Sequence, residues 1–154
     1  MDYDYHYMEE IGPDRICEQI PVTLEPAIYG ACIRIPQPYR KYIKDDEIWF
    51  VGNGAHQTLN IYSWDEWAAL EKRLVRATSK DNRKFRHVVR FFVSGIAESI
   101  IHDGRLYIPD HLLERAGIEK VGILLAVREN DGIRFVLTNA GGLYASDDRQ
   151  MSGE

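Results

Sequence analysis

An internal duplication is the feature of this sequence that most constrains its fold. Shifting the chain by 73 residues superimposes two apolar segments of the first half on two of the second: residues 33–36 on 106–109, and residues 47–51 on 120–124. A third apolar segment, residues 59–62, matches residues 134–137 at a shift of 75. Three segments in the same order, with nearly the same spacing, indicate two copies of one unit.

Each copy is predicted to contain a strand, a proline, a short helix, a second strand, a turn and a third strand. Pro36 and Pro109 follow apolar strands, where a proline cannot continue the ladder but suits the first turn of a helix. After Pro109, apolar residues recur at helical spacing and Gly117 is a natural C-cap; the apolar positions are Leu112, Leu113 and Ala116, and the same shift places Tyr39 on Leu112.

The segment between the copies has helical periodicity. Ser63 and Glu66 have the spacing of a capping box at a helix start. An apolar stripe follows at helical spacing, formed by Trp67, Leu70, Leu74 and Ala77. A second helix is predicted to begin at Ser79 or Asp81 and to carry Phe85, Val88, Val89 and Phe92 on one face. The fold class is therefore α+β and β-rich, with two β repeats joined by a pair of helices.

These segments predict the domain organisation. Repeat 1 is expected at residues 20–62, the helical linker at 63–92 and repeat 2 at 93–138. Residues 1–19 form an N-terminal arm, and its Tyr-, Asp- and Glu-rich residues 1–12 are either flexible or added as an edge strand. The polar composition of residues 139–154 is typical of a disordered tail.

Composition and motifs exclude several function classes. No apolar run approaches the roughly 20 residues of a membrane span, and the first residues do not form a signal peptide. Two cysteines do not make a disulfide or zinc framework, so Cys17 and Cys32 are interpreted as reduced thiols of a cytoplasmic protein, Cys32 in the core. The pair His102–Asp103 is interpreted as a polar turn. We expect no catalytic residue, no metal, no cofactor and no small-molecule substrate, and therefore no enzyme.

Positive charge gathers in one part of an acidic chain. The formal net charge is −5, yet residues 72–90 hold eight Lys or Arg and one acid, a local charge of +7. Such a cluster either contacts phosphates or an acidic partner, or forms a solvated helix face that pairs with the acidic arm of a neighbouring subunit.

One motif resembles a known family. Gly104-Arg105-Leu-Tyr-Ile-Pro109, followed by a short amphipathic turn ending at Ile118, is similar to the Gly-Arg-x-x-(Ile/Leu)-Pro signature of AbrB-like swapped-hairpin domains. Two such units joined by a helical pair resemble the MraZ family, and residues 61–67 resemble its strand leading into a Trp-containing helix start. The resemblance covers roughly residues 20–138 and implies a pseudo-twofold swapped-hairpin barrel with the linker helices packed outside.

The same resemblance implies a function. Members of the MraZ family are DNA-binding transcriptional regulators that act on the operon of division and cell-wall genes as ring-like homo-oligomers. A cytoplasmic, nucleoid-associated protein that binds double-stranded DNA and itself is therefore expected. The alternative is an oligomeric interaction or scaffold protein that has lost sequence-specific DNA binding.

The resemblance also selects the candidate DNA-binding residues. The family carries Asp-x-x-x-Arg at the hairpin of each repeat. In repeat 2 its arginine is Arg105 after Gly104, and its aspartate falls on Ile101 without a gap, or on His102 or Asp103 with one residue deleted. In repeat 1 the arginine position is Cys32 and the aspartate position is Ile28, but Arg34 follows on the same face of the strand. The expected DNA-binding set is Arg105, Gly104, Asp103, Arg34, Arg40 and Lys41, the last two holding phosphates.

Overall fold

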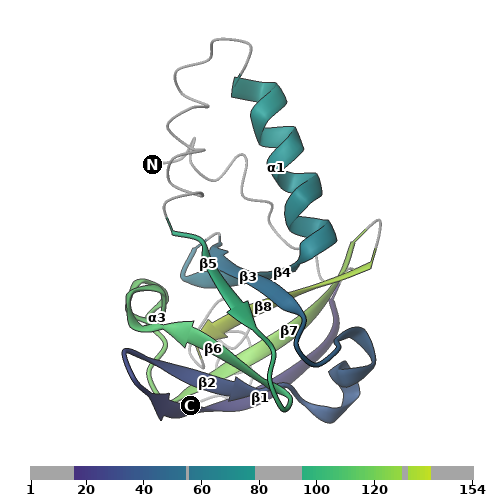
Figure 1. The fold of residues 1–154 in the computed structure, drawn as a ribbon. Helices are drawn as coiled ribbons and strands as arrows, with labels where there is room; N and C mark the ends of the chain where they lie inside the picture. The colour runs from purple at the N-terminus through teal and green to yellow at the C-terminus, as the bar shows by residue number, and fades with distance from the viewer. Residues whose placement is uncertain (1–15, 55, 79–94, 130–131, 140–154) are drawn as a thin grey trace, which may run out of the picture.

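Each half of the chain contributes four strands and one short helix to a single barrel. The computed structural model describes residues 16–54, 56–78, 95–129 and 132–139 (Figure 1). The elements of the first half are β1 (Ile16–Ala27), β2 (Gly30–Arg34), the 3₁₀ helix η3 (Gln37–Tyr42), β3 (Ile48–Asn53) and β4 (Thr58–Ser63). Helix α1 (Trp64–Thr78) then leads towards β5 (Ala97–Ile100), β6 (Arg105–Pro109), α3 (Asp110–Ala116), β7 (Val121–Glu129) and β8 (Gly132–Asn139).

The sheet exchanges one hairpin between the two halves. Its strand order is β5-β3-β4-β8-β7-β1-β2-β6, and every neighbouring pair is antiparallel. Hairpin β1–β2 of the first half joins β7 of the second, while β5 of the second half joins β3 of the first. A bridge between His102 and Arg105 connects the two outer strands, so the barrel is nearly closed. The predicted swapped-hairpin fold is confirmed, and each half completes the sheet of the other.

The core follows the alternation of β2 and β6. Ile33, Ile35, Leu106 and Ile108 are at most 1% exposed, because every second residue of these strands points into the barrel. Inside, the Phe135 ring packs against Tyr39 and Trp49, with centroid distances of 5.3 and 5.5 Å. The Tyr39 hydroxyl donates a 2.9 Å hydrogen bond to the carbonyl oxygen of Leu124, which ties the first half to a strand of the second.

The short helices begin at the two predicted prolines. Pro109 precedes α3, which buries Leu112, Leu113 and Ala116 and ends at Gly117 in the left-handed conformation, with φ 70°. The amide of Ile118 donates to the Leu113 carbonyl oxygen, which is the capping bond expected after such a glycine. Pro36 precedes η3, which is a 3₁₀ helix containing Pro38.

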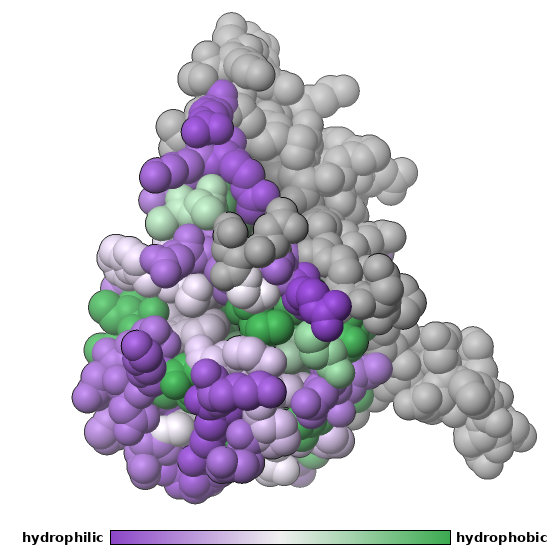
Figure 2. Space-filling model, turned by 90° about the vertical axis from the view of Figure 1, so that its right-hand side faces the viewer, coloured by the Kyte–Doolittle hydropathy of each residue, from purple (hydrophilic) through white to green (hydrophobic). Residues whose placement is uncertain are grey.

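Helix α1 begins with the predicted capping box. The Glu66 amide donates to the Ser63 hydroxyl, and the Ser63 amide donates back to the Glu66 carboxylate, at 3.3 and 3.4 Å. Trp67 packs on the outer face of the barrel against Phe50 and Tyr62, and α1 then projects away from the strands (Figure 1). Its outward face is mostly hydrophilic (Figure 2). The second linker helix, most of the basic segment 72–90 and residues 140–154 lie outside the described residues.

Strand β1 begins earlier than the predicted start of repeat 1 at residue 20. Residues from Ile16 onward pair with β7, and a bulge lies between Ile16 and Glu18. Three consecutive residues after Ile16 are exposed, so the first part of β1 shows no alternation by which the sequence could reveal it.

Candidate nucleic-acid interface

The hairpin between β5 and β6 turns on two residues. Asp103 and Gly104 have φ values of 53° and 72°, the pair of positive angles that a two-residue type I′ turn requires. His102 and Arg105 flank the turn and exchange two backbone hydrogen bonds of 3.0 and 2.9 Å. An Asp-Gly pair is a preferred sequence for this turn, because glycine adopts positive φ without steric cost. The turn places Arg105 at the first position of β6.

The Arg105 side chain lies on the outer face of the barrel. Its neighbour Leu106 is fully buried, so alternation directs Arg105 outward. Its Nε donates to the Glu25 carboxylate at 3.0 Å, and its Nη1 donates to the Asp103 carboxylate at 3.2 Å. The hydrogen bond and charge of Glu25 raise the pKa of the Arg105 guanidinium above its ordinary value. Arg105 is therefore a fixed positive charge with two acidic partners.

A second arginine lies beside Arg105. Arg34 is its register partner across the antiparallel pair of β2 and β6. Arg34 is exposed, whereas Ile33 and Ile35 on either side of it are buried. As predicted, Arg34 lies on the same face of β2 as Cys32, and in the structure that face points outward. One arginine from each repeat thus occupies the same end of the β2–β6 surface.

The Arg40 side chain packs against the turn formed by Asp103 and Gly104. Its Nε donates to the Ile35 carbonyl oxygen at 3.1 Å. A Cβ atom added to Gly104 would lie 3.0 to 3.4 Å from the guanidinium atoms of Arg40, so the turn and this side chain are in close contact. The Gly104 amide donates to Asp45 at 3.4 Å, and its carbonyl oxygen accepts from the Ile35 amide at 2.7 Å. These contacts fix the turn against η3 and the end of β2.

The structure gathers five of the six predicted residues. Asp103, Gly104 and Arg105 form the turn, with Arg34 and Arg40 beside it. Lys41 follows Arg40 in η3, but its ammonium group lies over the Tyr42 ring, 5.2 Å from the centroid. A groove of about 460 Å³ runs between β1 and η3, and its polar lining residues are Thr23, Glu25, Arg34, Gln37 and Arg40.

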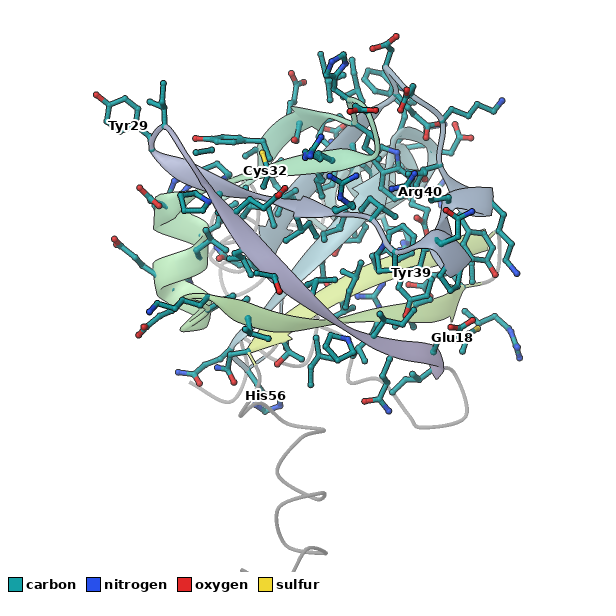
Figure 3. All side chains as sticks on the ribbon, turned by 90° about the horizontal axis from the view of Figure 1, so that it is seen from below. Glu18, Tyr29, Cys32, Tyr39, Arg40 and His56 are labelled. Atoms are coloured by element: carbon teal, nitrogen blue, oxygen red, sulfur yellow. The ribbon has the colours of Figure 1, made fainter. Side chains whose placement is uncertain are left out.

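The hairpin of repeat 1 differs from that of repeat 2. Cys32 matches Arg105 in the duplication, and its partner within the hairpin is Glu25, whereas the partner of Arg105 is His102. Beyond the Glu25–Cys32 pair, hairpin β1–β2 continues for two more residue pairs before its tip. The tip residues Ile28 and Tyr29 are 81% and 82% exposed. Figure 3 shows Tyr29 at this exposed tip, at the opposite side of the view from Arg40.

Cys32 does not belong to the core, so that prediction was wrong. Its thiol is partly exposed on the outer face, because the alternation of β2 buries its neighbours Ala31 and Ile33 instead. Partial burial raises the pKa of the Cys32 thiol, and the nearby Glu25 carboxylate raises it further. Cys32 pairs with Tyr107, as Arg34 pairs with Arg105. The pseudo-twofold surface therefore carries two arginines at one end and a cysteine and a tyrosine at the equivalent end.

Comparison with known proteins identifies the family. No protein-family model matches the chain. A protein named transcriptional regulator MraZ from Alkaliphilus metalliredigens is 36% identical over 123 residues, which cover 78% of this chain and 80% of the relative. The chain belongs to the MraZ family. A protein of the same name from Alkaliphilus oremlandii is 39% identical over 98 residues, and one from Clostridium tetani is 40% identical over 101 residues. The chain spans 65% of the Alkaliphilus oremlandii relative and 68% of the Clostridium tetani relative.

Two residues of this MraZ surface were missed by sequence reasoning. Glu25 contacts Arg105 although 80 residues separate them, and Asp45 accepts a hydrogen bond from Gly104 across 59 residues. Neither carries a local signal, because both contacts depend on the exchange of hairpins between the repeats.

Metal-ligating side chains do not cluster in the described part of the chain. Within residues 16–54, 56–78, 95–129 and 132–139, no group of three or more His, Cys, Asp or Glu side chains is placed to hold a metal ion. Over the same ranges, no helix is long and apolar enough to cross a membrane.

Proposed function

We propose that this MraZ family member is a sequence-specific DNA-binding transcriptional regulator. The observation that carries the proposal is the pairing of Arg34 with Arg105 on an exposed face at a rigid hairpin turn. Arginine is the side chain that most often reads guanine edges in the major groove, and it also binds phosphates. The relatives with 36–40% identity are named transcriptional regulators, which supports the same function.

In this proposal the surface residues have distinct roles. Arg105 is the main base-reading side chain, with Arg34 beside it from the other repeat. Asp103 and Gly104 form the turn that presents Arg105. Arg40, beside the turn, and Lys41, the next residue of η3, hold phosphates. The organisation into repeat 1 (20–62), linker (63–92) and repeat 2 (93–138), with an arm at 1–19 and a tail at 139–154, belongs to the same proposal.

The regulator is proposed to act as a ring-like homo-oligomer at promoters of division and cell-wall genes. A single arginine pair makes a small contact with DNA, and an assembly that presents several such pairs gains affinity by multivalency. Oligomerisation therefore compensates for the missing arginine at Cys32. The basic segment 72–90 is assigned to contacts with a neighbouring subunit rather than to DNA.

Equilibrium binding tests the proposal. The purified protein is titrated into a labelled duplex from its own upstream region and into a scrambled duplex, across a salt series from about 50 to 300 mM. Tighter binding to the upstream duplex, falling as salt rises, is expected. Arg105→Ala should weaken it by about 1 to 3 kcal/mol. Arg115→Ala, which removes the same charge from the exposed end of α3, is the matched control.

The contrary result also has a definite meaning. A folded protein that binds neither duplex, or both equally weakly, would contradict the proposed function. The loss of the repeat 1 arginine at Cys32 would then favour the alternative, an oligomeric interaction or scaffold protein without sequence-specific DNA binding.

A further inference from the structure

The proposed base-reading arginine is already occupied in the free protein. Arg105 donates from Nε to Glu25 at 3.0 Å and from Nη1 to Asp103 at 3.2 Å. Asp103 is a member of the same turn. Glu25 comes from β1 of the other repeat, and about half of its side chain surface is exposed (49%). The Glu25 contact is therefore formed by tertiary structure and not by the turn itself.

The acidic partners cancel the charge of the arginine pair. Arg34 and Arg105 carry two positive charges at this end of the surface, and Glu25 and Asp103 carry two negative ones. A guanidinium binds phosphate oxygens or a guanine edge through the same planar N–H donors that hold a carboxylate. DNA and Glu25 therefore compete for the N–H donors of Arg105, of which Nε and Nη1 already donate to the two carboxylates. Exposed ion pairs are individually weak, so a well-placed acceptor can displace Glu25.

We infer that Glu25 is a specificity-determining residue that competes with DNA for Arg105, an inference that rests on the proposed function. In a complex with scrambled DNA, no base edge is placed to displace Glu25, and Arg105 stays paired within the protein. In a complex with the recognised sequence, Arg105 exchanges Glu25 for the base edge. Glu25 thus prevents Arg105 from contacting a phosphate of non-specific DNA.

Charge-neutral substitution tests the competition. Glu25→Gln keeps the size of the side chain and removes its charge. Its affinity for the scrambled duplex should rise on the order of 3- to 10-fold, because Arg105, then paired with Asp103 alone, gains a phosphate contact. The salt dependence for that duplex should steepen by about 0.9 in log K against log salt. The affinity for the protein's own upstream duplex should rise less, so the ratio between the two duplexes should fall.

Two variants serve as controls. Glu18→Gln removes the same charge from an exposed position of β1, seven residues and roughly 23 Å of extended strand away; Figure 3 shows Glu18 at the opposite end of this strand from Tyr29. It should change neither affinity nor salt dependence. In the double variant Glu25→Gln/Arg105→Ala the gain should disappear, because the competition acts only through Arg105.

Each other outcome overturns the inference. Weaker binding by Glu25→Gln would show that Glu25 positions Arg105 for DNA. An affinity equal to that of Glu18→Gln, or an equal rise on both duplexes, would show that Glu25 does not set specificity. If the wild-type protein discriminates between the duplexes while Glu25→Gln gives one of these outcomes, only the inference fails. If wild type and Glu25→Gln both fail to bind or to discriminate, the proposed function fails, and the inference fails with it.

Discussion

Replacing Gly104 by alanine perturbs the turn that presents Arg105. Gly104 lies at φ +72°, where an L-residue with a Cβ atom is disfavoured by about 1 to 2 kcal/mol. The new Cβ would also lie 3.0 Å from Nη2 of Arg40, so the guanidinium must move. That movement weakens the 3.1 Å hydrogen bond from Arg40 to the Ile35 carbonyl oxygen, a loss of up to about 1 kcal/mol. Gly104→Ala should therefore lower the free energy of unfolding by about 1 to 3 kcal/mol.

Urea unfolding, followed by tryptophan fluorescence to which the buried Trp49 and Trp67 contribute, measures this loss. Gly104→Asn is the matched control, because asparagine tolerates the left-handed conformation but fills the same space. Gly104→Asn should lose only the part of the unfolding free energy that comes from crowding against Arg40, about 1 kcal/mol. In the double variant Gly104→Ala/Arg40→Ala this crowding is absent. Its loss of stability relative to Arg40→Ala therefore measures the cost of the positive φ alone. An alanine variant with the wild-type urea midpoint would refute the assigned turn geometry, and equal losses for alanine and asparagine would refute the backbone contribution.

Three further substitutions test contacts elsewhere in the barrel. Tyr39→Phe deletes the buried hydrogen bond to the Leu124 carbonyl oxygen and should cost about 1 to 2 kcal/mol in the same urea assay. Burial raises the pKa of Glu66 from 4.5 to about 7, so the folded state loses stability as pH rises between those values. Glu66→Gln, which keeps the capping bonds to Ser63, should raise the thermal midpoint at pH 8 but not at pH 4. The same increase at both pH values would contradict the raised pKa of Glu66. Arg134→Ala should cost about 1 to 3 kcal/mol, because it removes hydrogen bonds to the buried Asn60 and the partly buried Glu129; a cost below about 1 kcal/mol in urea would contradict this role.

The sequence predicts the parts of this fold that depend on local patterns. The alternation of residues 33–36 and 106–109, each ending in a proline, identifies β2 and β6 and the direction of their side chains. The Ser63–Glu66 spacing identifies the start of α1. These signals are short-range, and they repeat in both halves, so the duplication alone leads to a barrel of two similar units.

The contacts that shape the candidate site are long-range and leave no such pattern. The proximity of Glu25 to Arg105 follows from the pairing of β2 with β6, two strands from different repeats. The partly exposed position of Cys32 was misread because its neighbours are apolar, although the same alternation that exposes Arg34 exposes Cys32. The two additional residue pairs that lengthen hairpin β1–β2 depend on its register. Composition does not determine that register.

The central claim is that DNA binds at the arginine end of the β2–β6 surface. The most direct measurement compares two double variants for affinity on the protein's own upstream duplex and on the scrambled duplex. Arg34→Ala/Arg105→Ala should lose about 2 to 6 kcal/mol on the upstream duplex, and with it most of the discrimination between the two duplexes. Cys32→Ala/Tyr107→Phe, at the equivalent end of the same surface, should bind like the wild type. Wild-type affinity for the arginine double variant, or equal losses for both, would contradict the claim.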